Sequence, residues 1–204
     1  MIPNVVRGRD FHALLRYLVG PGRAGEHRSA RLVAGSWPFW GGIDSGEVLT
    51  AADVRDIARP LGDAGRVWDE FPRGGPVWHC QLFRSPGAAP LDDRRWRDLA
   101  HVFMAEMAFD DSSFHLADGS RDALAWLMTS PIGIDAARFV LTGKETVEPC
   151  DWVAVRHGLT KTGQDHVHIV SGVVRPDGSR VNLFRDWPRA QTAARAALFA
   201  VTAC

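Results

Sequence analysis

The feature that most constrains the fold of this chain is a pair of strand-like segments joined by a short polar loop. The first segment, residues 152–157, is rich in Val and contains a Trp. The second, residues 166–174, has β-branched residues throughout. The loop between them is polar and contains glycine. This pattern predicts two neighbouring strands of one sheet.

Three histidines lie where these two strands would meet. In a strand, residues two apart point to the same face, so His166 and His168 project side by side. His157 ends the first strand, and its imidazole reaches the other two if the strands pair. Three neutral imidazoles converging on one point make a divalent-metal site with open coordination positions. The alternative is that each is a structural or surface residue. Asp165 either orients one imidazole or simply starts the strand.

Further motifs surround these histidines: Arg156-His157, His166-Val167-His168, Arg175-Pro176-Asp177-Gly178 and Arg180-Val181-Asn182-Leu183. Together they resemble the metal-site segment of relaxases, the mobilisation nucleases of conjugative plasmids and integrative elements. Relaxases belong to the HUH endonucleases, named for His, a hydrophobic residue and His. The resemblance is clearest over residues 152–197 and is looser over residues 1–34.

The resemblance implies an activity. Relaxases nick one DNA strand at a transfer origin, and a tyrosine forms a covalent 5′-phosphotyrosine link that allows later rejoining. Their three-histidine metal site polarises the scissile phosphate, which makes His157, His166 and His168 the implied ligands here. The implied partners are single-stranded DNA at a transfer origin and other relaxosome proteins.

The family places its nucleophilic tyrosine on the first helix, before a glycine-rich break, and Tyr17 matches that position. The alternative for Tyr17 is an amphipathic residue on the flank of the helix. Some relaxases use a histidine near the N-terminus instead, which makes His27 the alternative nucleophile. His79 lies on a predicted strand and lines the site if that strand flanks the histidine strands.

The implied cofactor is one divalent metal ion. Imidazole ligands favour Mn²⁺, Zn²⁺ or Ni²⁺ over Mg²⁺, which prefers oxygen. Cells can nevertheless load Mg²⁺ or Mn²⁺ because of their availability. The ion that fills such a site is therefore left open between Mn²⁺ or Mg²⁺ and Zn²⁺ or Ni²⁺.

Charge is unevenly distributed along a chain whose net charge is zero. Residues 1–35 and residues 156–195 each carry a net charge of +4, so the remainder carries −8. If the two basic ends share one face, that face suits DNA. The alternative is that the arginines only solvate the surface. The candidate DNA contacts are Arg16, Arg23, Arg156 and Lys161.

The 204 residues suit a single domain over residues 1–204 that buries a core. No apolar run is long enough to cross a membrane, and no signal pattern is present, which predicts a cytoplasmic location. The three cysteines lack metal-ligand spacing and are interpreted as reduced thiols. Whether further domains follow Cys204 stays open.

Hydrophobic periodicity predicts an α+β fold with a central, mostly antiparallel sheet and helices packed on its faces. The resemblance implies a ferredoxin-like, HUH-type arrangement with the histidine strands central. Residues 110–150 give no clear pattern and are interpreted as an insertion. The predicted strands are 1–6, 31–34, 77–84, 152–157, 166–174 and 180–184, and the predicted helices are 11–19, 51–71 with an interruption at Pro60, 92–109 and 188–202.

Three functions are compatible with these residues. The first is strand-specific nicking and rejoining of DNA, which uses Tyr17 together with the histidines. The second is a metal-dependent hydrolase that uses a metal-bound water, for which Tyr17 is irrelevant. The third is a DNA-binding module in which the metal only braces the hairpin.

Overall fold

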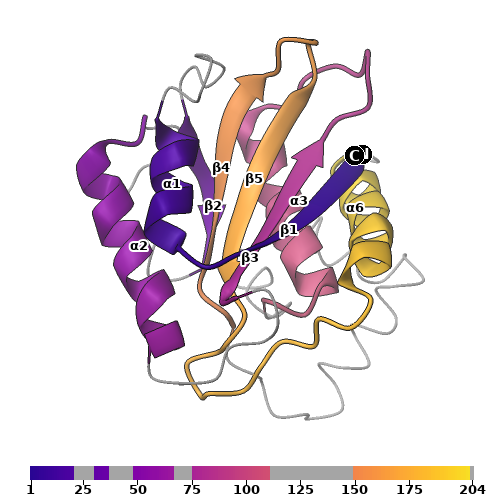
Figure 1. Cartoon of the computed structure of the whole chain (residues 1–204). Coiled ribbons are helices and arrows are strands. Elements are labelled where there is room, and N and C mark those ends of the chain that lie inside the picture. The colour runs from indigo at the N-terminus through magenta and orange to yellow at the C-terminus, as the bar shows by residue number, and fades with distance from the viewer. Residues whose placement is uncertain (21–29, 37–47, 67–74, 111–148, 203–204) are drawn as a thin grey trace.

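The structure is a computed structural model of the chain, and it describes residues 1–20, 30–36, 48–66, 75–110 and 149–202. The candidates Arg23 and His27 lie outside these residues. One antiparallel sheet has the strand order β1-β3-β5-β4-β2 (Figure 1). Its strands are β1 (Ile2–Gly8), β2 (Arg31–Gly35), β3 (Val77–Phe83), β4 (Trp152–Leu159) and β5 (Asp165–Gly172).

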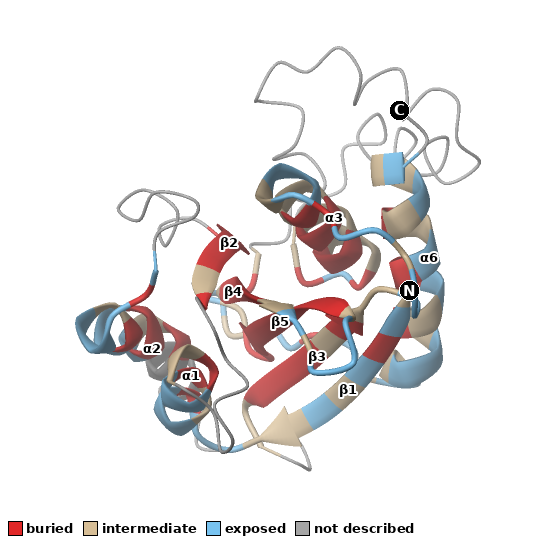
Figure 2. Cartoon of the chain, turned by 90° about the horizontal axis from the view of Figure 1, so that it is seen from above, coloured by how far each residue is buried: buried red, intermediate tan, exposed pale blue. Residues whose placement is uncertain are grey.

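The helices that pack on this sheet confirm the α+β prediction. Helices α1 and α2 cover one face, and α3 and α6 cover the other (Figures 1 and 2). None of the helices in the described part of the chain is both long and apolar enough to span a bilayer. The ferredoxin-like, HUH-type assignment stays a prediction. The helices are α1 (Phe11–Val19), α2 (Ala51–Arg66), α3 (Asp93–Glu106) and α6 (Asp186–Thr202).

Two elements differ from the sequence prediction. Helix α2 continues through Pro60, although proline removes one helical hydrogen bond. Its buried face, which includes Ile57 and Leu61, packs into the core and outweighs that loss. Residues 180–184 form no strand beyond a single bridge between Val174 and Arg180. Asn182 Oδ1 accepts a hydrogen bond from the Phe184 N–H at 2.9 Å, a local bond typical of a turn.

The proposed insertion at 110–150 falls largely on residues 111–148, which lie outside the described part of the chain. The two ends of that segment meet, because the Cys150 N–H donates to Phe109 O at 2.8 Å. The chain therefore leaves and re-enters the fold at one place, as an insertion requires. The insertion itself stays a prediction.

Side-chain alternation along β4 decides which face carries the histidines. Trp152 and Ala154 belong to the core under α3 and α6, whereas Val153 and Val155 belong to the core under α1 and α2. The histidine that follows two residues after Val155 therefore continues the α1 and α2 face. Strand β5 is buried along its whole length, since it is the middle strand of the sheet (Figure 2).

Helix α1 forms over the face that Val153 and Val155 share. Asp10 caps it by accepting a hydrogen bond from the Ala13 N–H at 2.9 Å. Its buried residues Phe11, Leu15 and Leu18 recur at helical spacing and pack into the same core as the two valines. The helix thus lies on the same side of the sheet as His157.

Candidate metal centre

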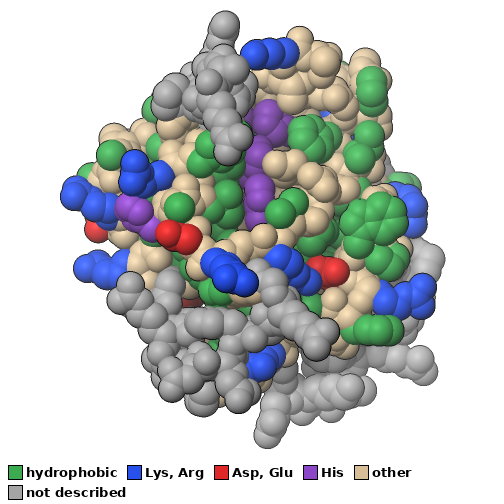
Figure 3. All heavy atoms as spheres, viewed as in Figure 1, with side chains coloured by type: hydrophobic (Ala, Val, Ile, Leu, Met, Phe, Trp, Pro, Cys, Tyr) green, Lys and Arg blue, Asp and Glu red, His purple; other side chains and the backbone are tan. Residues whose placement is uncertain are grey.

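The three predicted histidines converge at the β4–β5 hairpin. Each offers one ring nitrogen, and these atoms all lie within 4.8 Å of one another. His157, His166 and His168 are 1%, 7% and 4% exposed, so the cluster is buried. A line of histidine side chains is visible in the middle of the face that Figure 3 shows. This cluster could hold a metal ion, as the sequence predicted.

A β-bulge places His157 in the cluster. The pairing of β4 with β5 runs from Arg156 opposite Val167 directly to Gly158 opposite His166, so His157 is the extra residue. Gly158 has φ of 78°, a left-handed conformation that glycine adopts without steric cost. Bulges of this kind bend a strand and redirect a side chain. Here the bulge brings His157 towards both histidines of β5.

The same glycine orients His166. The Nδ1 atom of His166 lies 3.0 Å from Gly158 O, and a carbonyl oxygen can only accept, so Nδ1 carries the proton and donates it. The lone pair of the neutral ring is then on Nε2. A histidine whose other nitrogen donates to a carbonyl is the usual arrangement of a metal ligand.

His168 has a histidine as its partner. His79 on β3 places its Nε2 atom 2.9 Å from Nδ1 of His168, and the two rings stack with an interplanar angle of 16°. Burial lowers the pKa of His79 to about 4, so its ring is neutral at pH 7. His79 therefore lies against the cluster, where the sequence had placed it only on condition that β3 flanks the histidine strands.

Asp165 and Arg156 face the other side of the sheet. The Asp165 carboxylate accepts hydrogen bonds from the Leu91 N–H at 2.9 Å and from Trp96 Nε1 at 2.8 Å, and it pairs with Arg156. It therefore anchors the hairpin to α3 and does not orient an imidazole. Arg156 is 8% exposed and also pairs with Asp93. The Arg156 guanidinium thus lies between two carboxylates on the face opposite the histidines, and its role as a DNA contact stays a prediction.

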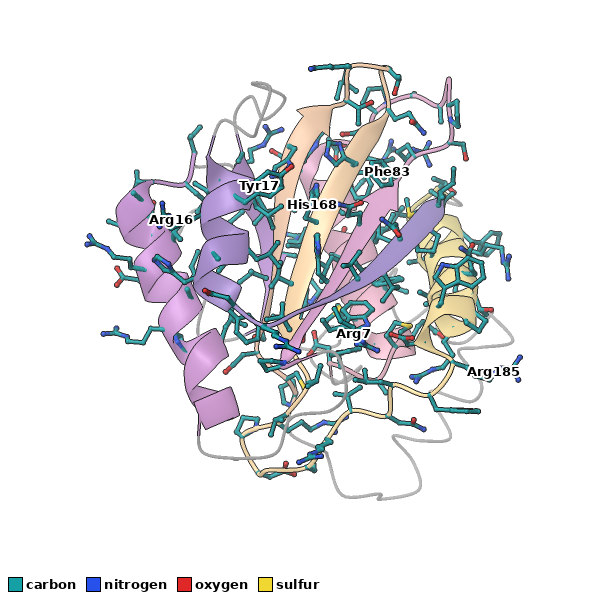
Figure 4. All side chains as sticks on the ribbon, viewed as in Figure 1. Arg7, Arg16, Tyr17, Phe83, His168 and Arg185 are labelled. Carbon is teal, nitrogen blue, oxygen red and sulfur yellow. The ribbon has the colours of Figure 1, made fainter. Side chains whose placement is uncertain are left out.

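The candidate nucleophile, Tyr17, lies on the same side of the sheet as the three histidines. Tyr17 is 42% exposed on α1, whose buried residues pack on the same side of the sheet as the cluster. Figure 4 shows Tyr17 on the side of α1 that faces β4, whereas Arg16 points towards α2. Arg16 and Lys161 are both exposed, and Lys161 lies in the turn between β4 and β5.

The fold and the site define an α+β protein whose antiparallel sheet carries a buried three-histidine cluster on one face, and α1, which covers that face, carries an exposed tyrosine. No model of a known protein family matches this chain. No curated protein matches it either. Any function must therefore be argued from the site itself.

Two features of the site were not predicted from the sequence. The bulge at His157 had a signal, because a glycine directly after a strand histidine is typical of a bulge. The bond between His79 and His168 had no local signal, since it joins residues 89 positions apart. It depends on β3 pairing with β5, which periodicity within each strand does not determine.

Changing His168 to Ala is expected to weaken binding of Mn²⁺ or Zn²⁺ by about tenfold or more. The loss of an outer partner of a ligand typically costs about 10- to 100-fold, and the loss of a ligand should cost at least as much. Isothermal titration calorimetry measures the affinity, and circular dichroism checks the fold. The matched control is His101→Ala, because His101 packs against Trp152 on the other face. Equal affinities in the His168→Ala variant and the parent would contradict the metal centre.

Proposed function

We propose that this protein nicks and rejoins one strand of DNA at a transfer origin, as the relaxases that it resembles do. The observation that supports the proposal most is that the single tyrosine of the chain, Tyr17, lies on the face of the sheet that carries the three histidines. That tyrosine is exposed and therefore accessible to a polymer. A tyrosine buried on the other face would have been incompatible with the proposal.

The reaction needs a hydroxyl nucleophile because a covalent intermediate conserves the phosphodiester for rejoining. The Tyr17 oxygen attacks the scissile phosphorus, and its proton passes to solvent or to a neighbouring base. The bond from phosphorus to the 3′ oxygen breaks, and that oxygen takes up a proton to leave as a 3′-hydroxyl. The 5′ end stays linked to Tyr17, and the reverse attack by the 3′-hydroxyl restores the strand.

The donor set fits a divalent cation. All three imidazoles are buried, and Nδ1 of His166 is held as a donor, so that ring presents Nε2. A cation held by His157, His166 and His168 would stabilise negative charge on the non-bridging oxygens of a bound phosphate. The burial of the three rings keeps their positions fixed before DNA arrives.

Two exposed basic side chains, Arg16 on α1 and Lys161 in the turn between β4 and β5, support the binding of a polyanion. Binding of single-stranded DNA is expected to fall steeply with salt, because each neutralised phosphate releases counterions. If Lys161 contacts a phosphate, Lys161→Ala should reduce the log–log salt slope by about 0.7. Fluorescence anisotropy with a labelled random-sequence oligonucleotide measures the slope, and Arg16→Ala should behave in the same way.

The control for this experiment is Arg195→Ala, which removes an exposed charge from α6 on the opposite face of the sheet. It should leave the slope unchanged. An affinity that does not depend on salt, or equal slope changes in all three variants, would contradict a DNA surface beside the histidines.

A further inference from the structure

We infer that His79 is a positioning residue that accepts the Nδ1 proton of His168 and so makes Nε2 the nitrogen that His168 offers to a metal. The inference rests on the metal centre in the proposed function. It begins from the distance of 2.9 Å between His79 Nε2 and His168 Nδ1, both on buried side chains. Two neutral ring nitrogens at this distance share one proton.

That proton can lie on either ring, and the two arrangements have opposite consequences. If it lies on His168 Nδ1, the lone pair of His168 is on Nε2, which can then coordinate a cation. If it lies on His79 Nε2, the remaining proton of His168 lies on Nε2, and that nitrogen cannot coordinate. Metal binding through Nε2 therefore requires His79 to accept, with its own proton on Nδ1.

His79 differs from the partner of His166 in one respect. Gly158 O can only accept, so it determines the tautomer of the neutral His166 ring. His79 can either donate or accept, so the tautomer of His168 depends on a second side chain. The protein thus has one ligand whose state is set by the backbone and one whose state is set by a residue that can be replaced.

The fold holds His79 firmly in this role. β3 pairs with β5 so that His79 is opposite Val170, one step diagonal to His168. The neighbouring residues Trp78 and Cys80 are buried in the core on the opposite face. His79 is itself 7% exposed and its ring stacks on that of His168, so it has little freedom to turn away.

Two replacements of His79 separate a hydrogen-bond role from a packing role. His79→Leu replaces the imidazole with an apolar side chain of similar volume and so removes the acceptor. It should weaken Zn²⁺ binding by about tenfold or more. His79→Gln offers a carbonyl oxygen near the position of Nε2 and should bind Zn²⁺ within about threefold of the parent, on the same scale of effects. Equal Zn²⁺ affinities in the His79→Leu variant and the parent would overturn the inference. A His79→Gln variant that binds Zn²⁺ as weakly as His79→Leu would overturn it too.

Nitrogen-15 NMR of the histidine rings tests the tautomer directly in the unaltered protein loaded with Zn²⁺. We expect a protonated Nδ1 in His168 and an unprotonated Nε2 in His79, with assignments made from the signals lost in His79→Gln. A His168 ring that is protonated on Nε2 or coordinated through Nδ1 would overturn the inference. These readouts need no DNA, so a protein that shows them without nicking would contradict only the proposed function. A parent protein that binds neither Zn²⁺ nor Mn²⁺ would overturn both.

Discussion

Changing Tyr17 to Phe is expected to abolish the covalent protein–DNA adduct while leaving metal and DNA affinity nearly unchanged. The change removes one oxygen from a side chain that is 42% exposed, so it should not disturb the core. The buried residues of α1 that dock on the sheet, Phe11, Leu15 and Leu18, are untouched. Loss of the adduct with binding retained would identify the hydroxyl as the nucleophile and not as a binding contact.

The assay uses a pool of single-stranded oligonucleotides with a randomised centre and a label at the 3′ end, incubated with Mn²⁺. The label stays with the fragment whose 5′ phosphate becomes linked to the protein, so the adduct is visible as a shifted band on a denaturing gel. His12→Ala is the matched control, because His12 is an exposed residue of the same helix. Adduct that persists in Tyr17→Phe but disappears in His27→Ala would assign the nucleophile to His27. Strand cleavage that continues in Tyr17→Phe without any adduct would favour a hydrolase.

Asp165→Ala is expected to lower the free energy of unfolding by about 3–5 kcal/mol. This is the range for removing one partner of a buried ion pair, which leaves the other charge buried. The Asp165 side chain has 0% exposure and pairs with Arg156, which is itself nearly buried. Removal of the carboxylate leaves the Trp96 Nε1–H and the Leu91 N–H without their acceptor. The expected loss is a large fraction of the stability of an ordinary domain.

Equilibrium unfolding in urea, followed by tryptophan fluorescence and circular dichroism, measures this change. Asp98→Ala is the control on α3, since Asp98 is exposed and pairs with Arg97 at the surface, and its cost should be within about 0.5 kcal/mol. A loss below about 1 kcal/mol in Asp165→Ala would show that the buried pair is not what fastens the hairpin to α3.

The sequence by itself determined most of the local elements and the face that His166 and His168 share. The period of two along residues 166–168 places His166 and His168 on one face whatever the rest of the chain does. Asp10 before an apolar stripe was sufficient to predict α1, whose cap and buried face the structure confirms. These predictions succeeded because each depends on residues within a few positions of one another.

The same period of two also indicates where two charged residues near the histidines point. Arg156 directly precedes His157 and Asp165 directly precedes His166, so each points to the face opposite its histidine. The structure shows this, because the two side chains pair on the face of the sheet that α3 and α6 cover. Their partners on α3 were not predictable, since Asp93 and Trp96 are more than 60 residues away in the chain.

Only the tertiary structure decided how the site is completed. The pairing of β3 with β5 brings His79 to His168, and the packing of α1 on the sheet brings Tyr17 to the histidine face. Both are non-local, and strand order in a sheet is set by the sum of many weak packing contacts that no single motif encodes. Local periodicity therefore determined which side chains share a face, and long-range packing determined which of those faces meet.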